Sequence, residues 1–166
     1  MRVQAYIGIG SNLGDRLGWC RAALDRLDLL PDTRLKRVSP ILESAPQEGV
    51  EGGLFLNAVA EIVTSLLPRR LLGHLRDIEA ALGRPLGHEP RSARTMDLDI
   101  LLYGDMVVSE PDLVIPHPRM IHRRFVLAPL VAIAPATRHP ILGITVEELL
   151  RRLRPETSVP LGGVSR

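Results

Sequence analysis

Residues 96–103 read MDLDILLY, a short apolar run that contains two aspartates. Successive side chains of a β-strand point to opposite faces, so residues two apart share a face at a spacing of about 7 Å. We therefore predict that Leu98, Ile100 and Leu102 point into a core. The two aspartates then project together from the opposite face of the same strand.

The aspartate pair, Asp97 and Asp99, is the first candidate site. Two adjacent carboxylates suit one or two Mg²⁺ ions, which prefer oxygen ligands and share them with substrate phosphates. The alternative is a half-exposed strand that carries two aspartates on its outer face without a role. Aspartate is disfavoured in strands, which favours the metal site.

The segment directly before this strand, from Gly83 to Arg94, is rich in glycine and proline and carries Arg84, Arg91 and Arg94. The planar guanidinium group of arginine binds phosphate through two parallel hydrogen bonds. An arginine-bearing loop beside a carboxylate pair is what binding of a triphosphate with its metals requires. The alternative is a solvated loop without a role.

A third group of candidates follows the strand, in the segment PHPRM at 116–120 and at Arg123. His117 lies between two prolines, and Arg123 lies at the start of a predicted helix, where the helix dipole favours an anion. A lone histidine is more often structural than catalytic. The five histidines show no zinc-like spacing and Cys20 is the sole cysteine, so we expect no transition-metal site.

The remaining periodicities predict one α+β domain. The order strand–helix–strand–strand–helix–strand is typical of a single ferredoxin-like α/β/α domain, with a mostly antiparallel sheet and helices packed on both of its faces. The predicted strands are Val3–Ile9, Arg34–Val38, Ile41–Glu43, Phe55–Thr64, Met96–Tyr103 and Met106–Ser109, and the predicted helices are Asp15–Leu30, Pro68–Leu82, Phe125–Ala134 and Val146–Arg152.

The bulk composition excludes several classes of protein. At 166 residues, 45% of them apolar, the chain fits one domain over 1–166, with a tail over about 155–166 that we expect to be frayed. No apolar run approaches the roughly 20 residues that span a bilayer, and a single cysteine permits no internal disulfide. We expect a soluble cytoplasmic protein that is a monomer or a weak oligomer. A net charge of +2 and the absence of an RNP-like motif or spare aromatic residues disfavour a nucleic-acid-binding module.

Taken in order, the motifs resemble one family, 6-hydroxymethyl-7,8-dihydropterin pyrophosphokinase. The resemblance extends from about Tyr6 to Pro135, and its most specific part is the R-x-x-D-x-D-I strand followed by the P-H-x-x-M box. The matching segments are YIGIGSNLG at 6–14, FLNA at 55–58, Ile78-Glu79, Gly83-Arg84, RTMDLDIL at 94–101, and IPHPRM at 115–120 with Arg123 and Phe125.

The resemblance implies an enzyme, a 2-amino-4-hydroxy-6-hydroxymethyldihydropteridine diphosphokinase of folate biosynthesis. Such an enzyme transfers a diphosphate from ATP, its co-substrate, to the pterin hydroxymethyl group and releases AMP. The alternative is another Mg-dependent phosphoryl or nucleotidyl transferase that acts on a small heterocyclic acceptor. A nucleotidyl transferase would release pyrophosphate in place of AMP. Either reading implies small-molecule substrates and neither a nucleic-acid nor a membrane partner.

The resemblance also implies a role for each matched residue. Asp97 and Asp99 would hold two Mg²⁺ ions that bridge the ATP phosphates. The other residues implied for nucleotide binding and catalysis are Arg76, Glu79, Arg84, Arg94, His117 and Arg123. Those implied for pterin binding are Asn12, Ser44, Ala45, Gln47, Phe55, Asn57 and Phe125, with the two phenylalanines, the only ones in the chain, sandwiching the flat ring.

The chain departs from the commonest family pattern at four places. It has RSAR at 91–94 where many members have a tryptophan before G-P-R. Leu86 replaces a frequent arginine, Pro118 a frequent tyrosine, and Arg76 a common glutamine. These departures fall on the predicted nucleotide side and leave the aspartates, Asn57 and the two phenylalanines unchanged.

Overall fold

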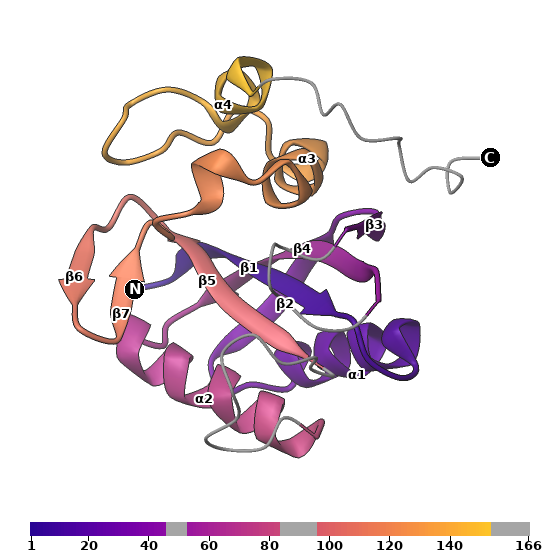
Figure 1. The fold of residues 1–166 in the computed structure, drawn as a ribbon. Coiled ribbons are helices and arrows are strands. Elements are labelled where there is room, and N and C mark those ends of the chain that lie inside the picture. Colours follow the sequence, from indigo (N-terminus) through magenta and orange to yellow (C-terminus); the bar gives the residue numbers. More distant parts are fainter. Residues whose placement is uncertain (46–52, 84–95, 154–166) are drawn as a thin grey trace.

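A computed structural model describes residues 1–45, 53–83 and 96–153. The predicted tail over 155–166 lies outside the described residues. Within them, a five-stranded sheet forms the centre, and all of its strand pairs are antiparallel (Figure 1). The strand order is β2-β4-β1-β5, and β3 pairs with β4 beside the end of β2. The strands are β1 (Val3–Ser11), β2 (Thr33–Val38), β3 (Leu42–Ser44), β4 (Phe55–Thr64) and β5 (Asp97–Tyr103).

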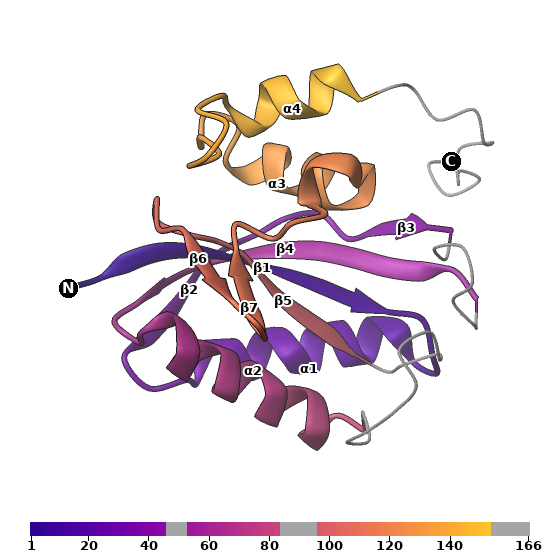
Figure 2. The same cartoon turned by 60° about the vertical axis from the view of Figure 1, so that its left-hand side comes forward.

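Helices cover both faces of the sheet, as Figure 2 shows. Helices α1 (Arg16–Asp28) and α2 (Pro68–Ala81) pack on one face, and α3 (Arg124–Ile133) and α4 (Val146–Arg152) pack on the other. The predicted single α+β architecture, with helices on both faces, is confirmed. A short hairpin of β6 (Val108–Glu110) and β7 (Leu113–Ile115) and a 3-10 helix η1 (Met120–His122) connect β5 to α3.

Each helical layer has its own apolar cluster against the sheet. The α1/α2 cluster contains Cys20, Leu75, Leu98 and Ile100, all buried, and burial raises the pKa of the Cys20 thiol to about 11. The cysteine is therefore part of the core. No helix among the described residues has the length and apolarity needed to cross a bilayer.

One prediction about β5 is wrong. Leu98 and Ile100 do face the α1/α2 layer, but Leu102 belongs to the cluster beneath α3 and α4. The register against β1 shifts between Tyr6 and Ile7, which leaves Leu101 as an extra residue in β5. A β-bulge of this kind reverses the facing of the residues that follow it. The strand β7 and the 3-10 helix η1 were also not predicted.

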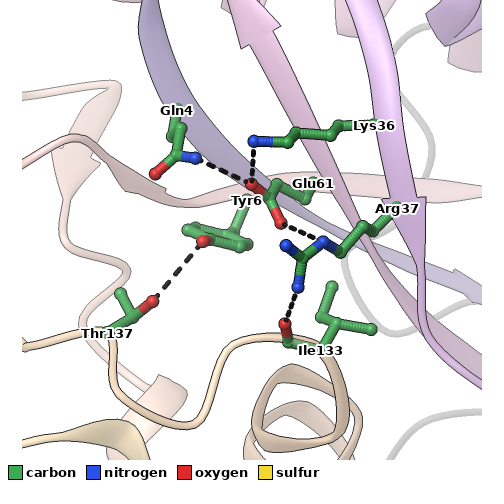
Figure 3. A network of polar contacts seen from close by, with 7 residues as sticks. All are labelled: Gln4, Tyr6, Lys36, Arg37, Glu61, Ile133 and Thr137. Atoms are coloured by element: carbon green, nitrogen blue, oxygen red, sulfur yellow. Dashed lines mark hydrogen bonds and ion pairs between the residues drawn. The ribbon is translucent and has the colours of Figure 1, made fainter.

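A buried carboxylate, that of Glu61 on β4, organises polar contacts at the far end of the sheet (Figure 3). It accepts a hydrogen bond from Gln4 Nε2 at 3.1 Å, and Lys36 Nζ and Arg37 Nε lie 3.9 and 3.7 Å from its oxygens. The two cations are consecutive in β2, and a register shift between Leu35 and Arg37 brings both onto Glu61.

The same network connects the end of α3 and the segment after it, through Ile133 and Thr137, to the sheet (Figure 3). Arg37 Nη1 donates to the Ile133 carbonyl at 3.0 Å, and the hydroxyls of Tyr6 and Thr137 lie 3.4 Å apart. These groups line a cavity of about 390 Å³. The second helical layer is thus held by polar contacts at this end as well as by its apolar cluster.

Leu75→Ala is expected to lower the free energy of unfolding by about 2–5 kcal/mol, because it removes a fully buried side chain of α2 and leaves a cavity. Chemical denaturation measures the change. Leu29→Ala is the matched control, since Leu29 is 81% exposed and its truncation should change stability by no more than about 0.5 kcal/mol. Equal losses in the two variants would contradict the assigned core.

Candidate active site

Three side chains converge around Gly10, near the end of β1. Gly10 pairs with Asn57 of β4 on one side and with Asp97 of β5 on the other. A Cβ placed on Gly10 would lie 3.6 Å from Phe55 Cδ1, 3.7 Å from Asn57 Oδ1 and 3.9 Å from Asp97 Cβ. The glycine therefore leaves open backbone between an amide, an aromatic ring and a carboxylate.

A second glycine, Gly8, lies two residues earlier in β1 beneath the Leu101 side chain, since a Cβ on Gly8 would lie 3.3 Å from Leu101 Cδ2. Gly8 pairs with Asp99 as Gly10 pairs with Asp97, so the two aspartates flank the glycines on one face of the sheet. Both aspartates are half-buried, whereas Leu98 between them is completely buried on the opposite side. The predicted alternation thus holds over Asp97–Ile100, ahead of the bulge.

The environment of Asp99 disfavours a negative charge. Loss of solvent and then the neighbouring Asp97 raise the pKa of Asp99 to about 7; Glu79 raises it further, while Arg76 and Arg123 lower it. A divalent cation would relieve the repulsion between the two carboxylates.

The donor set of this pair suits Mg²⁺. Among residues 1–45, 53–83 and 96–153, no group of three or more His, Cys, Asp or Glu side chains comes together as a metal site. An ion on Asp97 and Asp99 would therefore take further ligands from water or from a substrate. Mg²⁺ characteristically binds through one or two carboxylates plus phosphate oxygens and waters. The residues present fit such an ion.

His117 is fixed at the end of β5 by its main chain. Its N–H donates to the Leu101 carbonyl at 2.9 Å, and its Nδ1 accepts from the Arg119 N–H at 3.2 Å. An accepting Nδ1 places the proton of the neutral ring on Nε2. Burial, Arg123 and Arg119 lower the pKa of His117 to about 4, and Asp97 opposes them. The ring is therefore a neutral donor near the carboxylate pair.

Arg123 immediately precedes α3. Its guanidinium carbon lies 5.6 Å from the centroid of the Phe125 ring, within the range of a cation–π contact. Burial lowers the pKa of Arg123, and the charges of Asp99 and Asp97 oppose that shift. A cation and the N–H groups of a helix N-terminus thus lie within electrostatic reach of the aspartates, an arrangement suited to an anion.

The Asn57 amide is oriented by a neighbouring strand. Its Nδ2 donates to Ser44 Oγ of β3 at 2.6 Å, so its Oδ1 is the atom on the Gly10 side. Ser44, one of the residues implied for pterin binding, uses its side-chain hydroxyl to accept this bond. Ala45 beyond it is exposed, and Asn12, just after β1, is buried.

The two predicted residues of α2 lie on the other side of β5. Glu79 Oε2 accepts from the Leu98 N–H at 2.7 Å, and Arg76 Nη1 donates to the Leu98 carbonyl at 3.0 Å. Their predicted contact with a nucleotide stays a prediction. Predicted residues Gln47, Arg84 and Arg94, together with Leu86 and Arg91, lie outside the described residues.

Sequence reasoning missed the part played by the two glycines of β1. Gly8 and Gly10 alternate within a strand, and glycine inside a strand often marks a place where a ligand approaches the backbone. That alternation was the available signal. The bond between Ser44 and Asn57 left no local signal, because it joins strands 13 residues apart.

His117 is expected to stay neutral until the pH approaches 4. In the unfolded chain, this histidine has its ordinary pKa of 6.5. Between pH 4 and pH 6.5 the unfolded chain therefore binds more protons at this residue than the folded chain does. His117 thus makes the free energy of unfolding rise with pH between these two values. The pKa of Asp99 is raised from 3.8 to about 7 by folding, so Asp99 makes the free energy of unfolding fall as the pH rises between these values.

NMR titration of the His117 ring and the pH dependence of unfolding test this expectation. His117→Gln should make the unfolding free energy rise less with pH between 4 and 6.5 than in the wild type. Because the Asp99 contribution is present in both proteins, the difference between them isolates the histidine. A ring that titrates near 6.5 would contradict the assigned environment.

Comparison with known proteins agrees with this geometry. Residues 6–135 match the family model of 7,8-dihydro-6-hydroxymethylpterin-pyrophosphokinase (HPPK). The 2-amino-4-hydroxy-6-hydroxymethyldihydropteridine pyrophosphokinase of Pseudomonas aeruginosa is 40% identical over 98% of this chain and 96% of its own length. That of Bacillus subtilis is 44% identical over 78% of this chain and 77% of its own.

Longer proteins contain the same unit. The folic acid synthesis protein fol1 of Pneumocystis carinii is 35% identical over 89% of this chain, which spans only 20% of that protein. The wild-type HPPK-DHPS structure from Plasmodium falciparum matches 92% of this chain with a TM-score of 0.71 at 14% identity, and the match covers 45% of that protein, so it supports the fold alone. The chain belongs to the 7,8-dihydro-6-hydroxymethylpterin-pyrophosphokinase family, which confirms the resemblance of its motifs.

Proposed function

We propose that this chain transfers the diphosphate group of ATP to the hydroxymethyl oxygen of 6-hydroxymethyl-7,8-dihydropterin, yielding AMP and the pterin diphosphate of folate biosynthesis. The observation that carries the proposal is the convergence of Asn57, Asp97 and Asp99 on one face of the sheet around open glycine backbone. Membership of the family, with relatives that the chain spans almost completely, supports the same reaction.

The acceptor pterin would bind at the β4 side of Gly10. The oriented Asn57 amide offers an acceptor and donor pair for the hydrogen-bonding edge of the ring. Phe55 and Phe125, both half-buried, would provide the apolar faces that stack on the flat bicycle. The residues proposed to complete this part of the site are Asn12, Ser44, Ala45 and Gln47.

The triphosphate would bind at the β5 side of Gly10. Asp97 and Asp99 would hold Mg²⁺, two ions in the proposed arrangement, and bound metal would neutralise phosphate charge. His117 would donate its Nε2 proton to a phosphate oxygen, and Arg123 would add a positive charge beside the N-terminus of α3. Arg84 and Arg94 are proposed to contact the same phosphates.

The proposed reaction is an in-line displacement at the β-phosphorus. The pterin hydroxymethyl oxygen forms the new bond and loses its proton, while the bond from the β-phosphorus to the oxygen bridging it to the α-phosphate breaks. That bridging oxygen leaves with the electron pair as part of AMP. The chain's contribution would be to hold the two substrates on either side of Gly10, which makes the encounter effectively intramolecular.

Product analysis tests the reaction. Incubation with ATP, Mg²⁺ and the pterin should release AMP in step with pterin diphosphate. Asp97→Asn and Asp99→Asn should each lower kcat about a hundredfold or more, because each removes a charge from the proposed metal site. Asp105→Asn, in the exposed turn after β5, is the matched control and should retain activity.

The nucleotide product separates this reaction from its alternatives. Pyrophosphate in place of AMP would contradict diphosphate transfer and favour a nucleotidyl transferase, and ADP would indicate transfer of a single phosphoryl group. Full activity in either aspartate variant would contradict the proposed metal site.

Phe55→Leu is expected to raise the KM for the pterin about tenfold, because leucine keeps apolar volume but loses the π face that stacks on the ring. The KM for ATP should change little. Phe55→Tyr keeps the aromatic ring at the same position and should stay close to the wild type. Steady-state kinetics with either substrate varied measures both constants; an unchanged pterin KM in Phe55→Leu would place the acceptor elsewhere.

Small molecules are the proposed partners of this chain. ATP and the pterin account for the charged and the apolar halves of the candidate site. A monomeric state and a cytoplasmic location are likewise proposals, consistent with a single buried cysteine and with a reaction on soluble metabolites.

A further inference from the structure

The strand that carries both aspartates lies at the edge of the sheet. β5 pairs with β1 on one side and with no other sheet strand among the described residues on the other (Figure 1). Along such an edge, every second residue turns its N–H and C=O outward, where they need other partners.

Two side chains of α2 occupy this edge at a single residue. Glu79 Oε2 accepts from the Leu98 N–H at 2.7 Å, and Arg76 Nη1 donates to the Leu98 carbonyl at 3.0 Å. Arg76 Nη1 also lies 2.9 Å from Glu79 Oε1, so the two side chains form a closed arrangement around one peptide segment. We name these two residues the α2 clamp.

The clamp is unusual in its burial. The Glu79 side chain is 3% exposed, although an ionised carboxylate is costly to bury unless it is paired and hydrogen-bonded. Arg76 is half exposed and supplies the compensating charge, while the Leu98 N–H supplies a charge-assisted hydrogen bond. A leucine in place of Glu79 would avoid the burial of charge but would leave the Leu98 N–H without this acceptor.

The clamped residue lies directly between the two proposed metal ligands. The Leu98 side chain is itself fully buried in the α1/α2 cluster, so its main chain and side chain are both held. Since Asp97 and Asp99 are its immediate neighbours, any movement of the Leu98 backbone changes the spacing and direction of their carboxylates. α2 packs on the face away from α3, so the clamp acts from behind the site (Figure 2).

We infer that Glu79 and Arg76 are positioning residues, which hold the Leu98 backbone so that the Asp97 and Asp99 carboxylates keep the spacing needed for divalent metal. This inference rests on the proposed function only in taking those aspartates as the metal ligands. It assigns Glu79 a role through the protein backbone, distinct from the direct nucleotide contact that the motif predicts. Partners that orient metal ligands in this way typically change metal affinity or activity by about 10–100-fold when removed.

The test uses the full chain and three variants. Glu79→Ala removes the acceptor for the Leu98 N–H, Glu79→Gln keeps an acceptor oxygen of the same reach but removes the charge, and Arg76→Ala removes the bond to the Leu98 carbonyl. Glu147→Ala, an exposed carboxylate of α4, is the matched control. Mn²⁺ binding is measured by electron paramagnetic resonance, with a non-hydrolysable ATP analogue present and absent, alongside hydrogen exchange at Leu98 and steady-state kinetics.

Glu79→Ala is expected to speed exchange of the Leu98 amide, to weaken Mn²⁺ binding about tenfold or more and to lower kcat, with the pterin KM little changed. Glu79→Gln should recover most of the Mn²⁺ affinity. Arg76→Ala is expected to weaken Mn²⁺ binding in the same direction, and it also removes the charge that compensates the buried Glu79. Glu79→Gln buries no charge, so the inference remains testable if an alanine variant fails to fold.

Two results would overturn the inference. The first is unchanged Mn²⁺ affinity and kcat with a raised KM for ATP in the Glu79 variants, which indicates a direct nucleotide contact. The second is Glu79→Gln behaving like Glu79→Ala, which indicates that the charge and not the hydrogen bond matters. AMP formation by the wild type, measured in parallel, keeps the proposed function separate from either result.

Discussion

The antiparallel pairing of β1 with both β4 and β5 is the constraint on which the candidate site depends. That register sets Gly10 opposite Asn57 on one side and Asp97 on the other, and sets Gly8 opposite Asp99. A shift of one residue in either pair would turn an aspartate or the asparagine toward the α1/α2 core. The bulge at Leu101 lies beyond this region, so it redirects Leu102 without disturbing the carboxylates.

The two faces of the sheet differ in polarity and in what they support. The α1/α2 face is apolar and fixes the strands, whereas on the opposite face Gly10 leaves backbone accessible among Phe55, Asn57 and Asp97. The neutral His117 and the cation Arg123 lie near the carboxylate pair, in which burial and then the charge of Asp97 raise the pKa of Asp99. We expect such a site to bind metal cations and a polyanion together more favourably than it binds either one alone.

Local patterns predicted most of the architecture. The helix Val146–Arg152 and the strand Phe55–Thr64 were predicted with their observed bounds, because capping and apolar periodicity are encoded within each segment. The outward facing of Asp97 and Asp99 followed from alternation alone. Leu102 was placed on the wrong face because the bulge depends on pairing with β1, a partner about 95 residues away in sequence.

The contacts that orient the candidate site could not be predicted from patterns within single segments of the sequence. The bond from Asn57 to Ser44 and the α2 clamp on Leu98 both join segments brought together only by the tertiary fold. Motif resemblance predicted that these residues matter, yet it did not predict which atoms they contact. For the clamp, the resemblance implied a direct contact with the nucleotide, whereas the observed hydrogen bonds hold the backbone between the two proposed metal ligands.

A crystal structure with Mg²⁺, a non-hydrolysable ATP analogue and the hydroxymethyl-dihydropterin tests the proposed placement of metal and pterin on either side of Gly10. We predict metal density on the Asp97 and Asp99 carboxylates, the pterin ring beside Asn57, and the hydroxymethyl oxygen aimed across Gly10 at the β-phosphorus. Metal bound away from both aspartates, or the pterin in the cavity beside Glu61 at the far end of the sheet, would contradict it.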